Sequence, residues 1–286
     1  MSEVTVSQLD RPTPLPALRN DPRRVLRVGL ARAVLETKMF FREKDQIAFV
    51  FSIAVVMLII LASIFTTQYR GTDITVSQVY VAGLIGTGIT AVSFQNLGIS
   101  IAVERDQGGL RRLAGTPMPP SAYFIGKVGS VLVVAVIQVA ILLVLGVVLY
   151  DLQLPATIGP WLTFTWVFLL GLAAMTMLGI AASSVPRSAR SATAVITLPF
   201  VVLQFISGSF LPHTDLPDWL LNLSAIFPLK WICQGMRSVF LGQEAAFMEI
   251  AGSYELGKAF LVLTAWIVGG LVLCLLTFRW KDQHAG

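Results

Sequence analysis

The sequence predicts an all-α membrane protein with six transmembrane helices, an N-terminal amphipathic interfacial helix and a re-entrant helical hairpin before the last span. The chain of 286 residues is 55% hydrophobic and only 13% charged, whereas a typical soluble domain is about 25% charged. Six apolar stretches have the length of about 20 residues that a helix needs to cross a hydrocarbon core of about 30 Å. Basic residues gather at one end of each stretch, as expected for a protein with a fixed orientation in a membrane.

The apolar stretches contain no Asp, Glu, Lys, Arg or His, so we expect no titratable chemistry in the predicted spans. They use nearly half of the chain, which leaves no room for a second globular domain. The predicted spans cover residues 47–66, 79–103, 128–150, 161–182, 191–211 and 259–278.

The charge distribution orients these spans. Of the 21 Lys and Arg residues, 17 lie in alternate connecting segments that share one side of the membrane. The positive-inside rule then places both termini in the cytoplasm. The net charge of +5 is therefore an orientation signal and not a nucleic-acid footprint. We expect a disordered cytoplasmic head at 1–21, a six-span domain at 47–280 and a cytoplasmic tail at 281–286.

Residues 22–46 are predicted to form an amphipathic helix before the first span. Apolar residues recur at steps of three and four, and basic residues occupy the other positions. The apolar set is Val25, Val28, Ala31, Leu35 and Met39, and the basic set is Arg23, Arg24, Arg27, Arg32 and Lys38. Such a helix lies in the cytoplasmic headgroup layer, where it either anchors the chain or also grips a partner.

The most charged internal segment, 104–120, lies between the second and third spans and is too short for a domain. Glu104 and Asp106 precede Arg111 and Arg112, an order that suits the dipole of a short helix. Leu110 and Leu113 form a small apolar ridge at a spacing of three. Composition alone is compatible with a solvated loop as well as with a contact site.

The outer segment 212–258 is predicted to contain two short helices that begin at Pro217 and Pro228, because proline favours the first helical turn. Gly242 is a plausible stop for the second helix. Both are too short to span, so we expect re-entrant or interfacial helices, with Trp219 and Trp231 at interfacial depth.

Four amides lie within the predicted spans, and buried amides need a partner. They either pair helices or line a translocation path. These residues are Gln95, Asn96, Gln138 and Gln204. The pattern GxGxxA at 86–91 lies mid-span without a βαβ unit, so it does not indicate a dinucleotide site. Ala82, Gly86 and Thr90 instead have the spacing of small residues that allow close helix packing.

The sequence contains no GxSxG, HExxH or GxxxxGK[ST] motif, and no Cys/His spacing that suits a metal. We therefore expect neither an enzyme nor a metal site, and any ATP must be bound by another chain. Two function classes remain: a secondary carrier, and the membrane half of an ATP-driven pump. The lack of an intramembrane carboxylate or histidine favours the pump, although a sodium site of backbone carbonyls would escape that argument.

Three ordered motifs resemble the ABC-2 family of transporter permeases, over residues 22–280. The run ERDQGGLRRLAGTP at 104–117 is similar to the family's "ERE.GTL.RL..TP". Residues 205–220 are similar to "F.SG.F.P…LP.WL", and 227–242 to "NPL…..LR…..G". The overall pattern looks like bacterial drug- and antibiotic-resistance permeases. The chain departs from the family at Gly109, Phe227, Lys230 and Trp231, which weakens any inference about substrate.

The resemblance implies that 104–116 docks into a cytoplasmic ABC ATPase, which binds the ATP and Mg²⁺. The implied coupling residues are Glu104, Arg105, Gly108, Gly109, Leu110, Arg111, Arg112 and Leu113. An outer hairpin would include Pro212, Pro217, Trp219, Pro228, Trp231 and Arg237. The resemblance further implies a multi-pass protein of the bacterial cell membrane that encloses a path with a second copy or a sister permease.

The mostly aliphatic spans suit export of a hydrophobic or amphipathic small molecule or a lipid. The alternatives are a polysaccharide or glycolipid exporter of the same family, and an ATP-independent secondary carrier.

Overall fold

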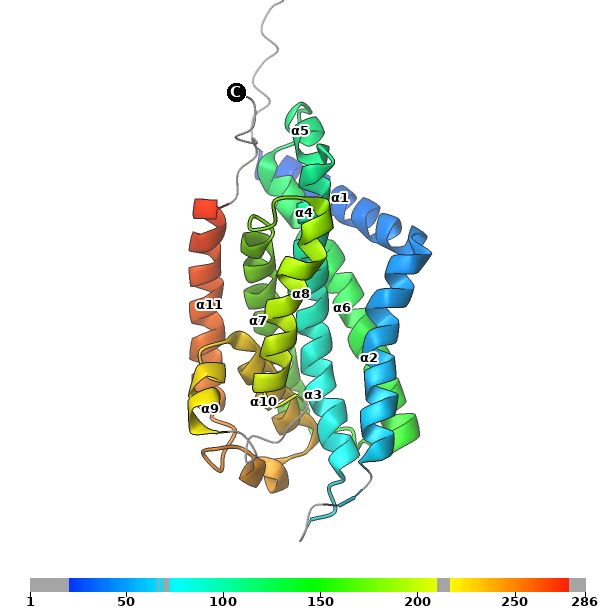
Figure 1. Ribbon diagram of the computed structural model, residues 1–286, viewed down its shortest axis with the longest axis vertical. Helices are drawn as coiled ribbons and strands as arrows, with labels where there is room; N and C mark the ends of the chain where they lie inside the picture. The colour runs from blue at the N-terminus through cyan, green and yellow to red at the C-terminus, as the bar shows by residue number, and fades with distance from the viewer. Residues whose placement is uncertain (1–20, 66, 69–71, 210–216, 278–286) are drawn as a thin grey trace, which may run out of the picture.

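The computed structural model describes residues 21–65, 67–68, 72–209 and 217–277, and the regular elements among them are helices (Figure 1). In chain order these are α1 (Pro22–Arg42), α2 (Lys44–Ile64), α3 (Val76–Thr90), the π-helix η1 (Ala91–Asn96), α4 (Leu97–Asp106), α5 (Gly109–Ala114), α6 (Pro120–Tyr150), α7 (Ile158–Ala182), α8 (Ala189–Ile206), α9 (Asp218–Ser224), α10 (Pro228–Phe240), the 3₁₀-helix η3 (Gln243–Met248) and α11 (Leu256–Thr277).

Among the described residues, six helices are long and apolar enough to cross a membrane: α2, the continuous helix α3–η1–α4, α6, α7, α8 and α11. They confirm the six predicted spans and the all-α fold. In Figure 1 they run along the long axis of one bundle, with α2 and α11 on opposite flanks. Helices α1 and α5 lie at one end of the bundle, and α9 lies at the other.

The helices that carry two of the spans are longer than the apolar stretches. The second continues to Asp106 instead of ending near 103, and α6 begins at Pro120, eight residues before the predicted start. These extensions carry Glu104, Arg105, Asp106 and Lys127, so the helices themselves are not free of charge. The charged side chains there have partners in the protein: Glu104 and Lys127 bind each other, while Arg105 and Asp106 bind the turn before α8.

The segment 104–120, for which the sequence left a solvated loop and a contact site open, is partly helical. Its first residues end α4, and Gly109–Ala114 form the short helix α5. Gly108 joins the two helices with a φ of 71°, a backbone conformation that strongly favours glycine. At Gly109 a Cβ would lie 2.7 Å from Cγ of Glu104, so a side chain there would crowd the turn.

The two short outer helices are confirmed as helices by α9 and α10. Pro217 caps α9, Pro228 opens α10, and Gly242 follows α10 with a φ of 67°. Pro212 and the rest of 210–216 lie outside the described residues, as do the head at 1–20 and the tail from 278. Whether α9 and α10 enter the membrane from one side, and whether α1 lies in the headgroup layer, stay predictions.

Helix α10 is almost entirely buried, and it packs against α3 and α7. The close approach depends on small residues. A Cβ on Gly86 would lie 3.0 Å from Cα of Cys233 on α10, and Ala82 and Thr90 are also fully buried. The small-residue spacing in α3 therefore serves helix packing, as predicted.

The π-helix in the middle of the second span has its own packing requirement. A Cβ on Gly179 of α7 would lie 2.7 Å from the carbonyl oxygen of Ser93 and 2.9 Å from that of Phe94. Backbone atoms cannot move aside as a side chain can. The glycine thus allows α7 to lie directly against η1.

We predict that Gly179→Ala destabilises the fold by about 1–3 kcal/mol, because the added methyl group overpacks a rigid backbone contact. Thermal unfolding in detergent, followed by tryptophan fluorescence, measures the change. Gly269→Ala on α11 is the matched control, since a Cβ there meets nothing within 4 Å. Equal melting temperatures for the two variants would contradict the packing argument.

Candidate functional site

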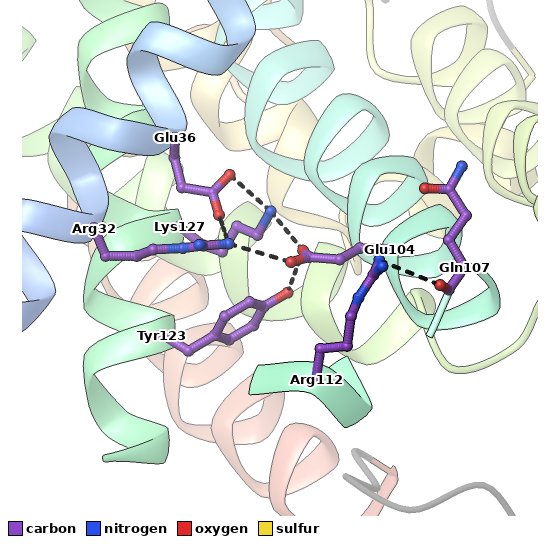
Figure 2. A network of polar contacts seen from close by, with 7 residues as sticks. All are labelled: Arg32, Glu36, Glu104, Gln107, Arg112, Tyr123 and Lys127. Atoms are coloured by element: carbon purple, nitrogen blue, oxygen red, sulfur yellow. Dashed lines mark hydrogen bonds and ion pairs between the residues drawn. The ribbon is translucent and has the colours of Figure 1, made fainter. Parts of the chain in front are cut away.

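The charged residues at the end of α4 each bind a different part of the chain. Figure 2 shows Glu104 at the centre of a cluster with Arg32, Glu36, Tyr123 and Lys127. These residues come from α1, α4 and α6, which are distant in sequence and meet at one end of the bundle. We call these five residues the charge cluster.

The carboxylate of Glu104 contacts both α1 and α6. Its Oε1 accepts a hydrogen bond from Nη2 of Arg32 at 3.2 Å. Its Oε2 accepts one from the Tyr123 hydroxyl at 3.0 Å and lies 2.9 Å from Nζ of Lys127. Both carboxylate oxygens are therefore used, and three helices are joined at one side chain.

Glu36 completes the charge cluster from α1. It lies 2.5 Å from Nη2 of Arg32 and 2.9 Å from Nζ of Lys127. The four charged side chains are between 5% and 19% exposed, and they alternate in sign. Two cations and two anions largely removed from water compensate one another, whereas any one of them left alone would be costly.

The next two residues of α4 bind the turn before α8. The guanidinium of Arg105 donates to the carbonyl oxygen of Pro186 at 2.5 Å. The carboxylate of Asp106 accepts from the backbone N–H of Ala189, the first residue of α8, at 3.0 Å. A carboxylate at a helix N-terminus satisfies a donor that the helix itself leaves unpaired. The sequence Glu104-Arg105-Asp106 thus connects α5 to α1, α6 and α8.

The residues of α5 divide into a buried and an exposed side. The sequence analysis expected Leu110 and Leu113 to form an apolar ridge. Leu110 is only 2% exposed, so it is part of the core and does not contribute to an exposed ridge. Leu113 is partly buried, while Arg111 and Arg112 are exposed. The outer surface of α5 is therefore basic. Arg112 also donates to the carbonyl oxygen of Gln107 at 3.4 Å (Figure 2).

The structure does not bring the four candidate path amides together. Gln95 donates to the hydroxyl of Thr197 on α8 at 2.9 Å, and Asn96 accepts from Gln46 of α2 at 3.1 Å. Gln138 is 1% exposed on α6, and Gln204 lies partly buried on α8. Two of the four therefore link neighbouring helices.

The outer hairpin contains a second buried ion pair. Arg237 of α10 donates to the carboxylate of Glu249 at 2.7 Å and to the carbonyl oxygen of Gly208 at 3.0 Å.

The two tryptophans of the predicted hairpin differ in their surroundings. Trp231 is 4% exposed and donates to the carbonyl oxygen of Ala225, so it is a packing residue, while Trp219 is 67% exposed. Burial lowers the pKa of Lys230, whose Nζ lies 3.7 Å from the centre of the Trp231 ring.

The residues that the sequence analysis missed are the partners of the predicted ones: Glu36, Tyr123, Lys127 and Glu249. Only a spacing signal was available for three of them, since Arg32 with Glu36 and Tyr123 with Lys127 are four residues apart.

Among the described residues, no group of three or more His, Cys, Asp or Glu could hold a metal ion.

We predict that Glu104→Gln lowers the free energy of unfolding by about 2–3 kcal/mol, because it removes charge-assisted hydrogen bonds to Arg32 and Lys127. Chemical or thermal unfolding in detergent measures this. Glu255→Gln is the control: Glu255 pairs with Lys258, which is 67% exposed, and loss of such a pair costs less than about 1 kcal/mol. A change no larger than in the control would show that the charge cluster does not stabilise the fold.

Comparisons with known proteins agree with this architecture. Residues 31–241 match the family model described as "ABC-2 type transporter". A relative from Escherichia coli K12, named "Probable multidrug ABC transporter permease YbhR", is 28% identical over 143 residues, which are 50% of this chain and 38% of the relative. "ABC transporter G family member 20" from Dictyostelium discoideum is 23% identical over 186 residues, 65% of this chain and 24% of the relative. The matched parts are thus well under two thirds of either relative. Because the family model covers most of the chain, the chain belongs to the ABC-2 type transporter family.

Proposed function

We propose that this chain is the permease subunit of an ATP-driven exporter and is coupled to a separate cytoplasmic ATPase that holds ATP and Mg²⁺. Family membership and six helices able to cross a membrane support this proposal. The 286 residues contain no phosphate-binding loop, which supports an ATPase site outside them. A second copy or a sister permease would complete the translocation path in the bacterial cell membrane.

The observation that carries the proposal is the attachment of α5. This short helix presents exposed Arg111 and Arg112, and the preceding Glu104, Arg105 and Asp106 connect it to α1, α6 and α8. A partner that binds and displaces α5 would therefore act on α1, α6 and α8 together. An ordinary connecting loop has no need for such contacts. The α4–α5 segment is therefore suited to pass motion from an ATPase to the membrane helices.

The buried position of Leu110 changes the expected chemistry of this contact. An apolar ridge of Leu110 and Leu113 would fill a hydrophobic groove, whereas the exposed surface of α5 is basic. We therefore propose an acidic surface on the ATPase that meets Arg111 and Arg112. The exposed apolar residues of α1, including Leu30 and Val34, would lie in the headgroup layer beside this contact.

The proposed cargo is a hydrophobic or amphipathic small molecule or a lipid. The spans are mostly aliphatic, and the relative from Escherichia coli is named a probable multidrug permease. A polysaccharide or glycolipid exporter is the alternative within the family, and a secondary carrier is the alternative outside it. ATP-independent transport by the chain alone would identify the carrier.

We predict that the double variant Arg111→Glu, Arg112→Glu weakens ATPase binding by about tenfold or more, because two charge reversals at a contact cost at least about 1.4 kcal/mol. The measurement is the amount of ATPase that co-purifies with the tagged permease, together with export by the complex. Insertion and expression should stay near those of the unaltered chain, since both side chains are exposed.

Lys258→Glu is the control for the change in charge, because Lys258 is exposed at the start of α11, at the other end of the bundle. It should leave co-purification unchanged. Normal ATPase binding and export by the double variant would refute a docking role for Arg111 and Arg112 of α5.

We also predict the orientation of the bundle. In intact cells, a cysteine at Arg187 should be protected from a membrane-impermeant thiol reagent, and a cysteine at Ser253 should be labelled. Both positions are exposed, and the native Cys233 and Cys274 are buried, so background labelling should be low. Labelling of the cysteine at 187 from outside would overturn the proposal that both termini are cytoplasmic.

A further inference from the structure

A cavity of about 630 Å³ lies beside the charge cluster, between α1, the start of α2, η1, α4, α5 and α6. Its volume falls within the range of about 300–1,000 Å³ that is typical of sites for drug-sized ligands. The coupling role proposed above does not use this space, so it requires a separate explanation.

The lining of the cavity changes from charged and exposed to apolar and buried. Glu43, Gln107 and Arg112 line it and are exposed, so they mark its mouth. At the other end it is lined by Val92, Val131 and Val134, which are 1%, 6% and 2% exposed. Between these ends, Gln46, Asn96, Ser100 and Ser130 supply polar groups without charge. A ligand that matches this gradient has one polar and one apolar end.

The charges of the lining residues balance. Three cations face three anions: Arg32, Arg112 and Lys127 with Glu36, Glu43 and Glu104. Figure 2 shows how Arg32, Lys127 and Glu104 point toward one another. A ligand with a net charge would leave one sign in excess in a partly dehydrated site, at a cost in free energy. The lining therefore favours a neutral or zwitterionic head group.

Two buried polar groups lack partners among the described residues, Arg32 in the cavity wall and Gln138 beyond the residues that line it. Nε of Arg32, in the cavity wall, has no hydrogen-bond acceptor among the described residues. Gln138 lies one turn beyond Val134 on α6, is 1% exposed, and neither of its amide atoms has a partner in the described part of the chain. Side chains on a helix lean toward its N-terminus, so this amide lies toward the apolar end of the cavity. Buried polar atoms without partners are rare, and each calls for an explanation.

We propose that this cavity is a binding site for a single-chain or drug-sized amphiphile with a neutral or zwitterionic head group, which enters from the cytoplasmic end of the bundle. The head group lies among the balanced charges of the lining, next to Arg32. The apolar body lies against Val92, Val131 and Val134. The site goes beyond the coupling role of α5, because its occupation requires no ATPase.

The test uses the full chain in phosphatidylglycerol nanodiscs and a dodecylphosphocholine probe that carries a photoactivatable diazirine in its chain. Cross-linked peptides are mapped by mass spectrometry. We expect cross-links in η1 and in the part of α6 around Val131 and Val134. Unlabelled dodecylphosphocholine should reduce them at least about tenfold more effectively than dodecyl sulfate or dodecyltrimethylammonium at equal concentration, which corresponds to about 1.4 kcal/mol of discrimination.

Two variants that fill the cavity provide the mutational test. Val134→Trp and Ser130→Leu should each reduce cross-linking at η1 and α6 several-fold. Val133→Trp is the matched control, because Val133 is next in the chain, is 42% exposed and does not line the cavity. Size-exclusion chromatography identifies any variant that fails to fold, and the cross-link map of the unaltered chain needs no variant.

Three results would overturn the proposal. Cross-links confined to residues outside the cavity would show that the probe reports only bilayer contact. Equal competition by the charged amphiphiles would refute the assigned head group. Equal cross-linking by a two-chain phosphatidylcholine with the same photoactivatable group would assign the cavity to bilayer phospholipid instead of a single-chain ligand.

Discussion

The carboxylate of Glu104 is the contact on which the end of the bundle that carries α1 and α5 depends. It binds Arg32 of α1 and both Tyr123 and Lys127 of α6 within 3.2 Å. Helix α1, the second span and the third span therefore meet at one group. Because the four charges of the cluster compensate one another, the cluster holds only while all of them stay together.

The sequence was sufficient for the parts of the fold that depend on local pattern. The six spans follow from the length of the apolar stretches, and α9 and α10 follow from proline at their starts. The ends of the helices were harder to predict from the sequence. Extension of α6 back to Pro120 places Lys127 inside a helix, and this depends on Glu36 and Glu104, which are distant in sequence. Single-sequence patterns contain no information on such pairs.

The candidate site shows the same difference between features set by local sequence pattern and features set by contacts between distant residues. The motif at 104–116 indicated the segment that we propose for coupling, but not which side of α5 faces the protein. The spacing of Leu110 and Leu113 was compatible with either orientation, and burial of Leu110 is decided by packing of α5 against α4. Likewise, the four span amides looked alike in sequence. The structure distinguishes Gln95 and Asn96, which join helices, from Gln138, which has no partner among the described residues.

The charge cluster and the proposed amphiphile site share Arg32, Glu36, Glu104 and Lys127. This overlap has a consequence for coupling. If a ligand head group draws Arg32 or Lys127 away from Glu104, it weakens the attachment of α5 to α1 and α6. Displacement of α5 by a partner would in turn change the charge balance at the mouth of the cavity. Linkage requires the two effects to be equal in free energy. Ligand occupation and the position of α5 are therefore expected to influence each other through one small set of ion pairs.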